Sequence, residues 1–373
     1  MKETIREALT HHWALDNMAA EVLANRIDDS GQNSILESAY SELSDTAIAK
    51  RDINRQRIGD IFSGRSDEKF IAIGPCSLDI EIDYLPLFEY IEELQSEHPE
   101  VVLVLRANGA KPRTNVGWTG LWYSNDPEVR QRQFTIYREA FERGLPIITE
   151  ITEGNQLGAL GPMLSSVWVG ARDVEPTGHR GKFSAYHLPV GVKNGTTGDL
   201  TIVKDAIQAI RSNSEINFDS GVDLGTIASN PRHTGIATGI VPVGEGNQNI
   251  AIFSRGYGLP ETLSTEERNL VAFDYLSRTN ALGKLLGSTV VIDGTHSVPP
   301  MFGIPKKSAD RFIPVLEVIH NGMRDDSIRD ADQIVGVMGE VGIVEGRTDP
   351  NFVLDDERKE ILRNALRLTV QEL

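Results

Sequence analysis

Cysteine is nearly absent from this 373-residue sequence, and long apolar runs are missing altogether. The single cysteine, Cys76, cannot form an intramolecular disulfide, so a reducing, cytoplasmic location is the simplest expectation. No stretch reaches the about 18 consecutive apolar residues that a transmembrane helix requires, and residues 1–7 lack the apolar core of a signal peptide. These absences argue against a membrane partner.

Basic residues are also scarce. The chain has 37 Lys and Arg against 54 Asp and Glu, which gives a net charge of −17 at pH 7. Such a deficit argues against nucleic acid and anionic membranes as partners, because both require a basic face on the protein. It also makes local basic clusters informative, since an acidic protein that gathers Lys and Arg in one place is expected to bind a small anion there.

The polar segment 1–67 is expected to be a helical extension with no chemistry of its own. A helix that includes residues 53–62 is expected to end near Gly64. We assign this extension to oligomerisation or regulation. Residues 68–373 form the second region, and residues 216–246 within it are expected to be an inserted β hairpin or loop.

Strand and helix patterns alternate through the second region. Eight short apolar runs, typical of strands buried on both faces, are separated mostly by helical segments. This alternation predicts an α/β fold of the (β/α)8 TIM barrel type, with a doubly wound open sheet as the alternative. The eight expected strands are residues 70–74, 101–106, 145–150, 166–172, 188–193, 249–255, 289–293 and 334–340.

Basic residues recur where these strands end. In a TIM barrel the carboxyl ends of the strands meet at one face, which carries the active site. The run 101–105 leads directly into Arg106, Lys111 and Arg113, with no acidic residue inside that segment. Guanidinium and ammonium groups suit phosphate and carboxylate, so the pattern predicts a small, highly charged substrate such as a phosphorylated carboxylate. The cations expected to converge on it are Arg106, Lys111, Arg172, Lys193 and Arg255.

Three other strand ends carry potential metal ligands, namely Cys76, His296 and Glu340. Thiolate, imidazole and carboxylate together suit a divalent transition metal. Taken singly, a lone cysteine is more often a small apolar residue, and a lone Glu at a barrel rim is more often a solvated ion-pair partner. The joint placement of the three at the ends of different strands favours a metal site.

Several motifs resemble those of the class I 3-deoxy-D-arabino-heptulosonate-7-phosphate (DAHP) synthases. The resemblance runs in order from about Asp52 to Gly346. The combination of Lys-Pro-Arg-Thr with Val-Gly-Trp is its most specific part. The motifs are Gly74-Pro-Cys-Ser77, Lys111-Pro-Arg-Thr114, Val116-Gly-Trp118, Gly170-Ala-Arg172, Pro189-Val-Gly-Val-Lys-Asn-Gly195, Ser254-Arg-Gly256, Val337-Met-Gly-Glu340 and Val344-Glu-Gly346.

That family condenses phosphoenolpyruvate with erythrose 4-phosphate in a metal-dependent (β/α)8 barrel, the first step of the shikimate pathway of aromatic amino acid biosynthesis. The resemblance thus implies a transferase, a 3-deoxy-7-phosphoheptulonate synthase. It implies that phosphoenolpyruvate is bound by Arg106, Lys111, Gly170, Ala171, Arg172, Lys193 and Arg255. The residues it implies for the acceptor aldehyde are Pro112, Arg113 and Thr114.

The resemblance also implies catalytic residues and a metal. The expected catalytic residues are Arg106, Lys111, Glu150 and His296. The expected cofactor is a divalent ion, Mn, Co, Fe or Zn, bound by Cys76, His296 and Glu340. By analogy with relatives of similar layout, the chain is expected to form a homodimer or homotetramer.

The segment after the eighth strand departs from the family pattern. The family's fourth metal ligand is an Asp there, but here Gly346 leads almost directly into the last helix, leaving Asp349, Asp355 or Asp356 as candidates. Two alternatives to an ordinary DAHP synthase therefore stay open. One is a relative that condenses phosphoenolpyruvate with a different carbonyl acceptor in specialised metabolism, and the other is a non-catalytic anion-binding relative.

Overall fold

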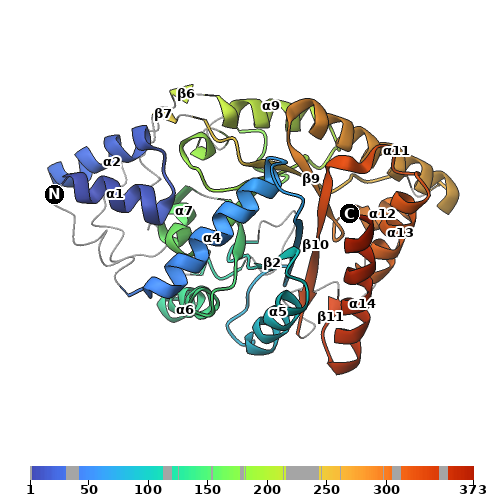
Figure 1. Cartoon of the computed structure of the whole chain (residues 1–373), viewed down its shortest axis with the longest axis horizontal. Coiled ribbons are helices and arrows are strands. Elements are labelled where there is room, and N and C mark those ends of the chain that lie inside the picture. Colours follow the sequence, from blue (N-terminus) through green and yellow to red (C-terminus); the bar gives the residue numbers. More distant parts are fainter. Residues whose placement is uncertain are drawn as a thin grey trace.

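Eight parallel strands form the centre of the molecule in a computed structural model (Figure 1). The structure describes residues 2–30, 42–111, 120–124, 126–152, 154–176, 180, 182–212, 214–215, 243–244, 246–260, 262–296, 298–304, 312–343 and 352–373. The strands follow chain order around the sheet: β1 Lys69–Gly74, β2 Val101–Arg106, β3 Ile147–Ile151, β4 Ser166–Val169, β5 Val190–Lys193, β8 Ile250–Ser254, β9 Thr289–Asp293 and β10 Ile334–Gly342.

The sheet closes on itself because β1 pairs in parallel with both β2 and β10. Phe70 is in register with Val102 on one side and with Gly336 on the other. At this seam a Cβ on Gly336 would overlap the Phe70 carbonyl oxygen, so only glycine permits the approach. The expected (β/α)8 barrel is confirmed, and the alternative of an open, doubly wound sheet is wrong.

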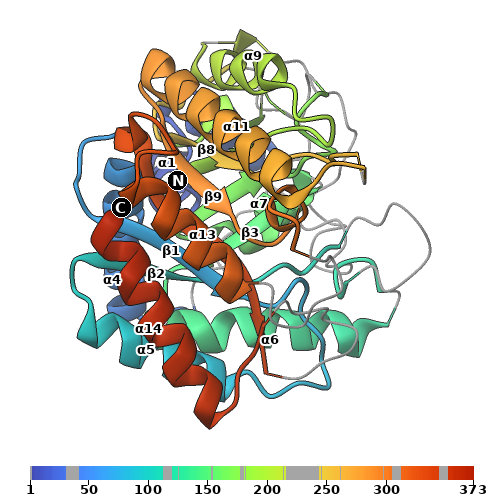
Figure 2. The ribbon, with the colours of Figure 1, turned by 90° about the vertical axis from the view of Figure 1, so that its right-hand side faces the viewer.

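Helices surround the strands on the outside of the barrel (Figure 2). Their ends carry ordinary stop and start signals: Asp126 caps α6 before Pro127, and Ser264 and Glu267 form a capping box on α11. Gly144 ends α6 at a φ of 81°, a conformation that favours glycine. The main outer helices are α5 Leu85–Glu97, α6 Pro127–Arg143, α7 Gly154–Leu160, α9 Leu200–Arg211, α11 Thr265–Leu286, α12 Val298–Met301, α13 Phe312–Arg324 and α14 Asp356–Glu372.

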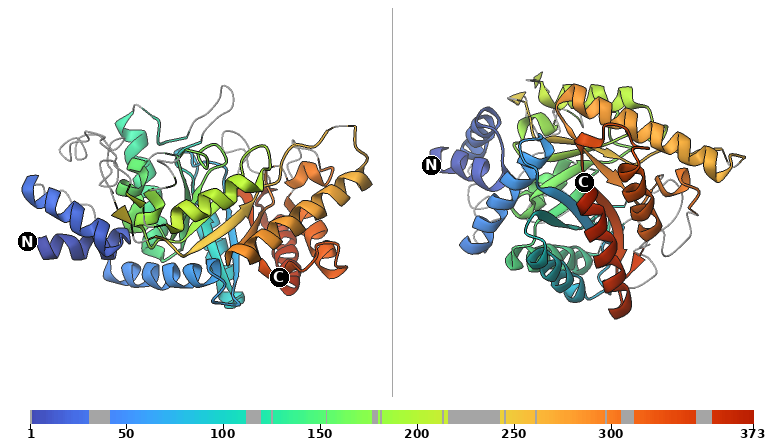
Figure 3. Two further views of the ribbon diagram at one scale, coloured as in Figure 1. Left: turned by 90° about the horizontal axis from the view of Figure 1, so that it is seen from above. Right: turned by 45° about the vertical axis from the view of Figure 1, so that its right-hand side comes forward.

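A separate apolar core fills the inside of the barrel. Helix α4, Asp45–Phe62, runs along the amino-terminal side of the strands and inserts Ile58, Ile61 and Phe62 into it (Figure 3). We call this inner core the floor, and its members are Ile58, Ile61, Phe62, Phe70, Ala72, Val102, Val104, Ile148, Trp168, Ala251, Phe253, Val291, Val335 and Met338. The expected helix before the first strand is present, and it begins earlier than residue 53.

The two helices that precede α4 pack on the barrel of their own chain. These are α1, Lys2–Trp13, and α2, Asn17–Ser30. The Trp13 indole Nε1 donates a hydrogen bond to the Gly158 carbonyl at 2.8 Å, and Leu15 forms an antiparallel bridge with Tyr186. In the described residues the extension therefore packs on the barrel of its own chain.

The inserted segment begins and ends in a small antiparallel ribbon. β6, Ser214–Glu215, pairs with β7, Val243–Gly244. The residues between these two strands lie outside the described part of the chain, so the expected hairpin at 216–246 is tested only at its ends. None of the described helices is long and apolar enough to cross a membrane.

Candidate active site at the carboxyl ends of the strands

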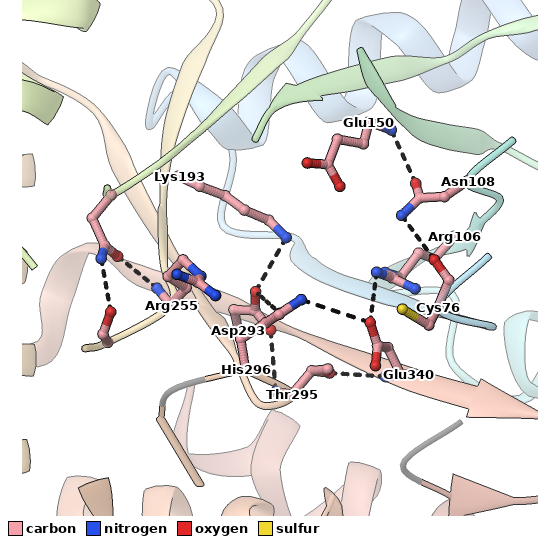
Figure 4. A network of polar contacts seen from close by, with 12 residues as sticks. Cys76, Arg106, Asn108, Glu150, Lys193, Arg255, Asp293, Thr295, His296 and Glu340 are labelled. Atoms are coloured by element: carbon pink, nitrogen blue, oxygen red, sulfur yellow. Dashed lines mark hydrogen bonds and ion pairs between the residues drawn. The ribbon is translucent and has the colours of Figure 1, made fainter. Parts of the chain in front are cut away.

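The charged residues expected from the sequence come from alternate strand positions. Side chains of a strand point to opposite faces in turn, so a residue two positions beyond a floor residue also faces the barrel interior. Val104 is thus followed by Arg106, Ile148 by Glu150, Phe253 by Arg255, Val291 by Asp293 and Met338 by Glu340. We call the charged layer above the floor the mouth. Its labelled members converge in Figure 4.

The first ion pair of the mouth joins β2 to β10. Arg106 Nη2 lies 2.9 Å from Glu340 Oε1, and both side chains are almost fully buried. The second guanidinium nitrogen, Nη1, donates to the Pro75 carbonyl oxygen. Burial alone would raise the pKa of Glu340, but Arg106 and His296 together hold the pKa of that carboxyl below its ordinary value. Both groups are therefore charged at neutral pH.

A second cluster centres on Asp293 at the end of β9. Its Oδ2 atom lies 3.2 Å from Lys193 Nζ and 2.8 Å from His296 Nδ1. Burial alone would raise the pKa of Asp293, whereas His296, Lys193 and Arg255 hold it well below its usual range. The carboxylate also fixes the imidazole, which leaves Nε2 as the ring nitrogen that faces Glu340, 3.8 Å from Oε1.

Trp168 of β4 forms the boundary between floor and mouth. Its buried ring lies under two cations, with Lys193 Nζ 4.9 Å and Arg106 Cζ 5.3 Å from the ring centroid. The negative face of an aromatic ring attracts both charges. The ring therefore offsets part of the electrostatic repulsion between Arg106 and Lys193.

The potential metal ligands are near one another but not gathered around one point. Burial together with the nearby Glu340 carboxylate raises the pKa of the Cys76 thiol to about 12. Lys111, buried beside Cys76, acts in the opposite direction. Within the described residues, no three His, Cys, Asp or Glu side chains form a group that could hold a metal ion as they stand.

Two of the expected cations have acidic partners. The segment that contains Arg106 has no acidic residue of its own, but β10, remote in sequence, supplies Glu340 to Arg106, and β9 supplies Asp293 to Lys193. Arg255 is half-buried and its backbone N–H donates to Asn194 Oδ1 at 2.7 Å. Arg172, just beyond β4 after Gly170 and Ala171, is exposed.

Part of the expected site is not described. Pro112, Arg113, Thr114 and Asp349 lie outside the described residues. Asp355 is exposed and caps α14, where its side chain accepts the Arg358 backbone N–H. β11, Phe352–Val353, pairs with the end of β10 just before this cap.

Sequence reasoning missed several polar residues that organise the mouth. Asp293 entered the sequence analysis only as the last residue of the seventh expected strand, although its place two residues after Val291 marks it as inward-facing. Asn108 accepts the Glu150 backbone N–H at 3.0 Å and donates to the Cys76 carbonyl at 3.2 Å. The Thr295 hydroxyl accepts the Glu340 N–H at 3.0 Å. The contacts of Asn108 and Thr295 join segments from different strands, and no local sequence pattern indicates them.

Comparisons with known proteins agree with the fold and the motifs. Residues 42–357 match the model of the DAHP synthetase I family. A solved structure, a phospho-2-dehydro-3-deoxyheptonate aldolase from Francisella tularensis SCHU S4, superposes with a TM-score of 0.67 and 22% identity. That superposition covers 90% of this chain and 96% of the other, and it supports the barrel fold.

Curated relatives share a higher identity over a shorter span. The Tyr-sensitive phospho-2-dehydro-3-deoxyheptonate aldolase of Escherichia coli K12 is 34% identical over 168 residues, 42% of this chain and 46% of the relative. The phenylalanine-inhibited enzyme of Saccharomyces cerevisiae is 36% identical over 166 residues, 42% of this chain and 44% of the relative. These alignments thus span about half the length of the relatives. With the family model matching most of its residues, the chain belongs to the DAHP synthetase I family.

Proposed function

We propose that this chain is a 3-deoxy-7-phosphoheptulonate synthase, which condenses phosphoenolpyruvate with erythrose 4-phosphate and releases phosphate. The observation that carries the proposal is the mouth itself, where Arg106, Lys193 and Arg255 approach one space from three strands. Cations preorganised in a site that excludes water stabilise the carboxylate and phosphate of an anionic substrate far better than cations in bulk water. Lys111 and Arg172 complete the proposed phosphoenolpyruvate site, with Gly170 and Ala171 between β4 and Arg172.

We further propose a divalent metal ion held by Cys76, His296 and Glu340. The types of donor fit such an ion, and the Asp293 contact to His296 Nδ1 is the outer support that metal-bound histidines ordinarily have. When bound, the ion would polarise the carbonyl group of the aldehyde as a Lewis acid. The protein's part is to keep the imidazole oriented through Asp293.

The acceptor side of the site rests on the sequence motif. Pro112, Arg113 and Thr114 follow Lys111 directly, and we propose that they hold the phosphate end of the aldehyde. Lys111, the last described residue before them, is buried. We assign Glu150, whose carboxylate faces the same space, to catalysis together with Arg106, Lys111 and His296 (Figure 4).

A second candidate function is condensation of phosphoenolpyruvate with another carbonyl acceptor. The observation that favours it is the short connection after β10, where β11 and the Asp355 cap of α14 leave little chain for a further ligand or acceptor contact. The proposed oligomer, a dimer or tetramer, and the proposed cytoplasmic location apply to either function. Light scattering of the intact chain that gives a monomer mass would refute the oligomer.

The function is tested by measuring phosphate release from phosphoenolpyruvate with erythrose 4-phosphate and with a panel of other aldehydes. We expect turnover with one acceptor, loss of turnover in excess chelator, and recovery on adding Mn²⁺. Turnover with a different aldehyde alone would establish the second candidate. Binding of phosphoenolpyruvate without turnover on any acceptor would instead favour the non-catalytic relative. Full activity in excess chelator would remove the metal proposal.

A further inference from the structure

Two carboxylates lie next to each other beside the cations of the mouth. Glu150 ends the inward-facing positions of β3, and Asp173 follows β4 in a turn closed by a 3.0 Å hydrogen bond from its N–H to the Gly170 carbonyl. A Cβ on Gly170 would overlap Glu150 Oε1 and lie 3.2 Å from Asp173 Oδ2. The two carboxylate oxygens therefore lie on either side of one small volume. That volume is open because Gly170 has no side chain.

The two members of this pair have different surroundings. Glu150 interacts favourably with Arg106 of β2 and Arg255 after β8. Asp173 Oδ2 is buried, and among the described residues it accepts no hydrogen bond. A buried carboxylate oxygen without a donor is costly when charged, and a second carboxylate beside it raises that cost. Asp173 Oδ2 is therefore a suitable place for a proton, whereas the two arginines near Glu150 favour a negative charge there.

We propose that Glu150 and Asp173 form one acid–base unit, in which Asp173 takes up a proton as an anionic substrate binds and Glu150 accepts a proton from water. The inference rests on the proposed function for the identity of the substrate. In the condensation, C3 of phosphoenolpyruvate bonds to the aldehyde carbon, and the aldehyde oxygen takes the proton of the unit. Water then bonds to C2 and passes one proton to Glu150, which returns it to Asp173 and restores the starting state. The C2–O bond to phosphate then breaks, and phosphate leaves with that electron pair and with the proton of the C2 hydroxyl, which leaves a ketone.

The charges that face Asp173 set the direction of its titration. Burial and Glu150 raise the pKa of Asp173 to about 6, and Arg172 on the same segment acts in the opposite direction. Glu175, two residues further along that segment, adds a carboxylate near Gly195. An added anion repels the ionised form of Asp173, so binding raises its proton affinity further, and by linkage the proton strengthens anion binding.

Calorimetry of phosphoenolpyruvate binding near pH 6.5, in buffers with different heats of ionisation, tests the proton uptake. The wild-type protein should take up part of a proton for each phosphoenolpyruvate bound, and Asp173→Asn should take up none. Asparagine keeps the shape of the side chain, and an unchanged unfolding temperature would show that the variant is folded. Equal proton uptake by both proteins would overturn the proposal.

Infrared titration of the protein without substrate tests the pair independently of any activity. We expect a protonated-carboxyl band that disappears with a midpoint near pH 6, is absent in Asp173→Asn, and shifts to lower pH in Glu150→Gln. Persistence of that band in Asp173→Asn, or an unshifted midpoint in Glu150→Gln, would contradict the unit. A protein that gives these bands but binds no phosphoenolpyruvate would refute the proposed function and leave the pair standing.

Discussion

The floor and the mouth of the barrel are built by the same strands and differ in almost every physical respect. The floor consists of apolar side chains that α4 seals from below. The mouth, one inward position beyond the floor on β2, β3, β8, β9 and β10, holds buried charges such as Arg106 and Asp293. Apolar burial supplies stability without direction, whereas paired buried charges cost desolvation and are retained for recognition. On these strands a spacing of only two residues therefore separates the side chains that stabilise the barrel from the side chains proposed to bind the substrate.

Removing an aromatic side chain from the floor should have the largest effect on stability. Phe253 packs against Phe62, Phe70 and Trp168 with ring centroids 5.7, 6.0 and 6.1 Å away. Phe253→Ala should lower the free energy of unfolding by about 3–5 kcal/mol through lost burial and the cavity left behind. Denaturant unfolding measures it. Leu270→Ala, at an exposed position, is the matched control and should change stability by less than about 0.5 kcal/mol.

The folded Phe253→Ala protein should keep its Michaelis constant for phosphoenolpyruvate. Its side chain belongs to the floor, and its aromatic contacts are with other floor residues, namely Phe62, Phe70 and Trp168. A large rise in that constant without a loss of stability would show that floor and mouth are not separable.

Removing the charge of Asp293 should affect the mouth first. Asp293→Asn leaves Lys193 and His296 without their shared anion, and we expect the rate to fall roughly 30- to 100-fold, about 2–3 kcal/mol in the barrier. Steady-state kinetics at saturating phosphoenolpyruvate measures this loss. A wild-type rate in the variant would contradict a role for Asp293 in orienting the two groups.

The same variant has a predicted pH dependence of stability. Because the folded pKa of Asp293 is held well below its usual range, its contribution is present above the unfolded value of about 3.9 and is lost as pH falls through the folded value. The stability deficit of Asp293→Asn should therefore be full at pH 7 and shrink only in strong acid. A deficit that vanishes already at pH 5 would contradict the assignment.

The boundary residue Trp168 should give the smallest effect. Trp168→Phe keeps an aromatic face under Arg106 and Lys193 but weakens the attraction, so affinity for phosphoenolpyruvate should fall by about 0.5–1 kcal/mol, roughly 2- to 5-fold. Trp168→Leu, which has no ring, should lose more. Binding measured by calorimetry distinguishes them, and equal affinities for the two variants would mean that the ring acts only by filling space.

The sequence was sufficient for the strands and for most of the mouth. Continuous apolar runs locate strands that are buried on both faces. A charged residue directly after such a run is expected at the carboxyl end of the strand, where a barrel carries its active site. The ion pairs could not be predicted from the sequence, because Arg106 and Glu340 are 234 residues apart and only barrel closure brings them together. Asp293 could have been found from period-two alternation. The docking of Trp13 on Gly158 depends on tertiary packing that an irregular helical pattern does not encode.

The central claim, that the mouth binds phosphoenolpyruvate, is tested most directly by the affinity of Lys193→Ala for that compound. Lys193 is almost fully buried at the mouth, whereas Lys204 on α9 is exposed and provides the matched control. By calorimetry, with both variants folded, Lys193→Ala should bind phosphoenolpyruvate about 30-fold or more weakly, a loss of at least about 2 kcal/mol, and Lys204→Ala should bind it like the wild type. Wild-type affinity in Lys193→Ala would place the substrate elsewhere and contradict the account.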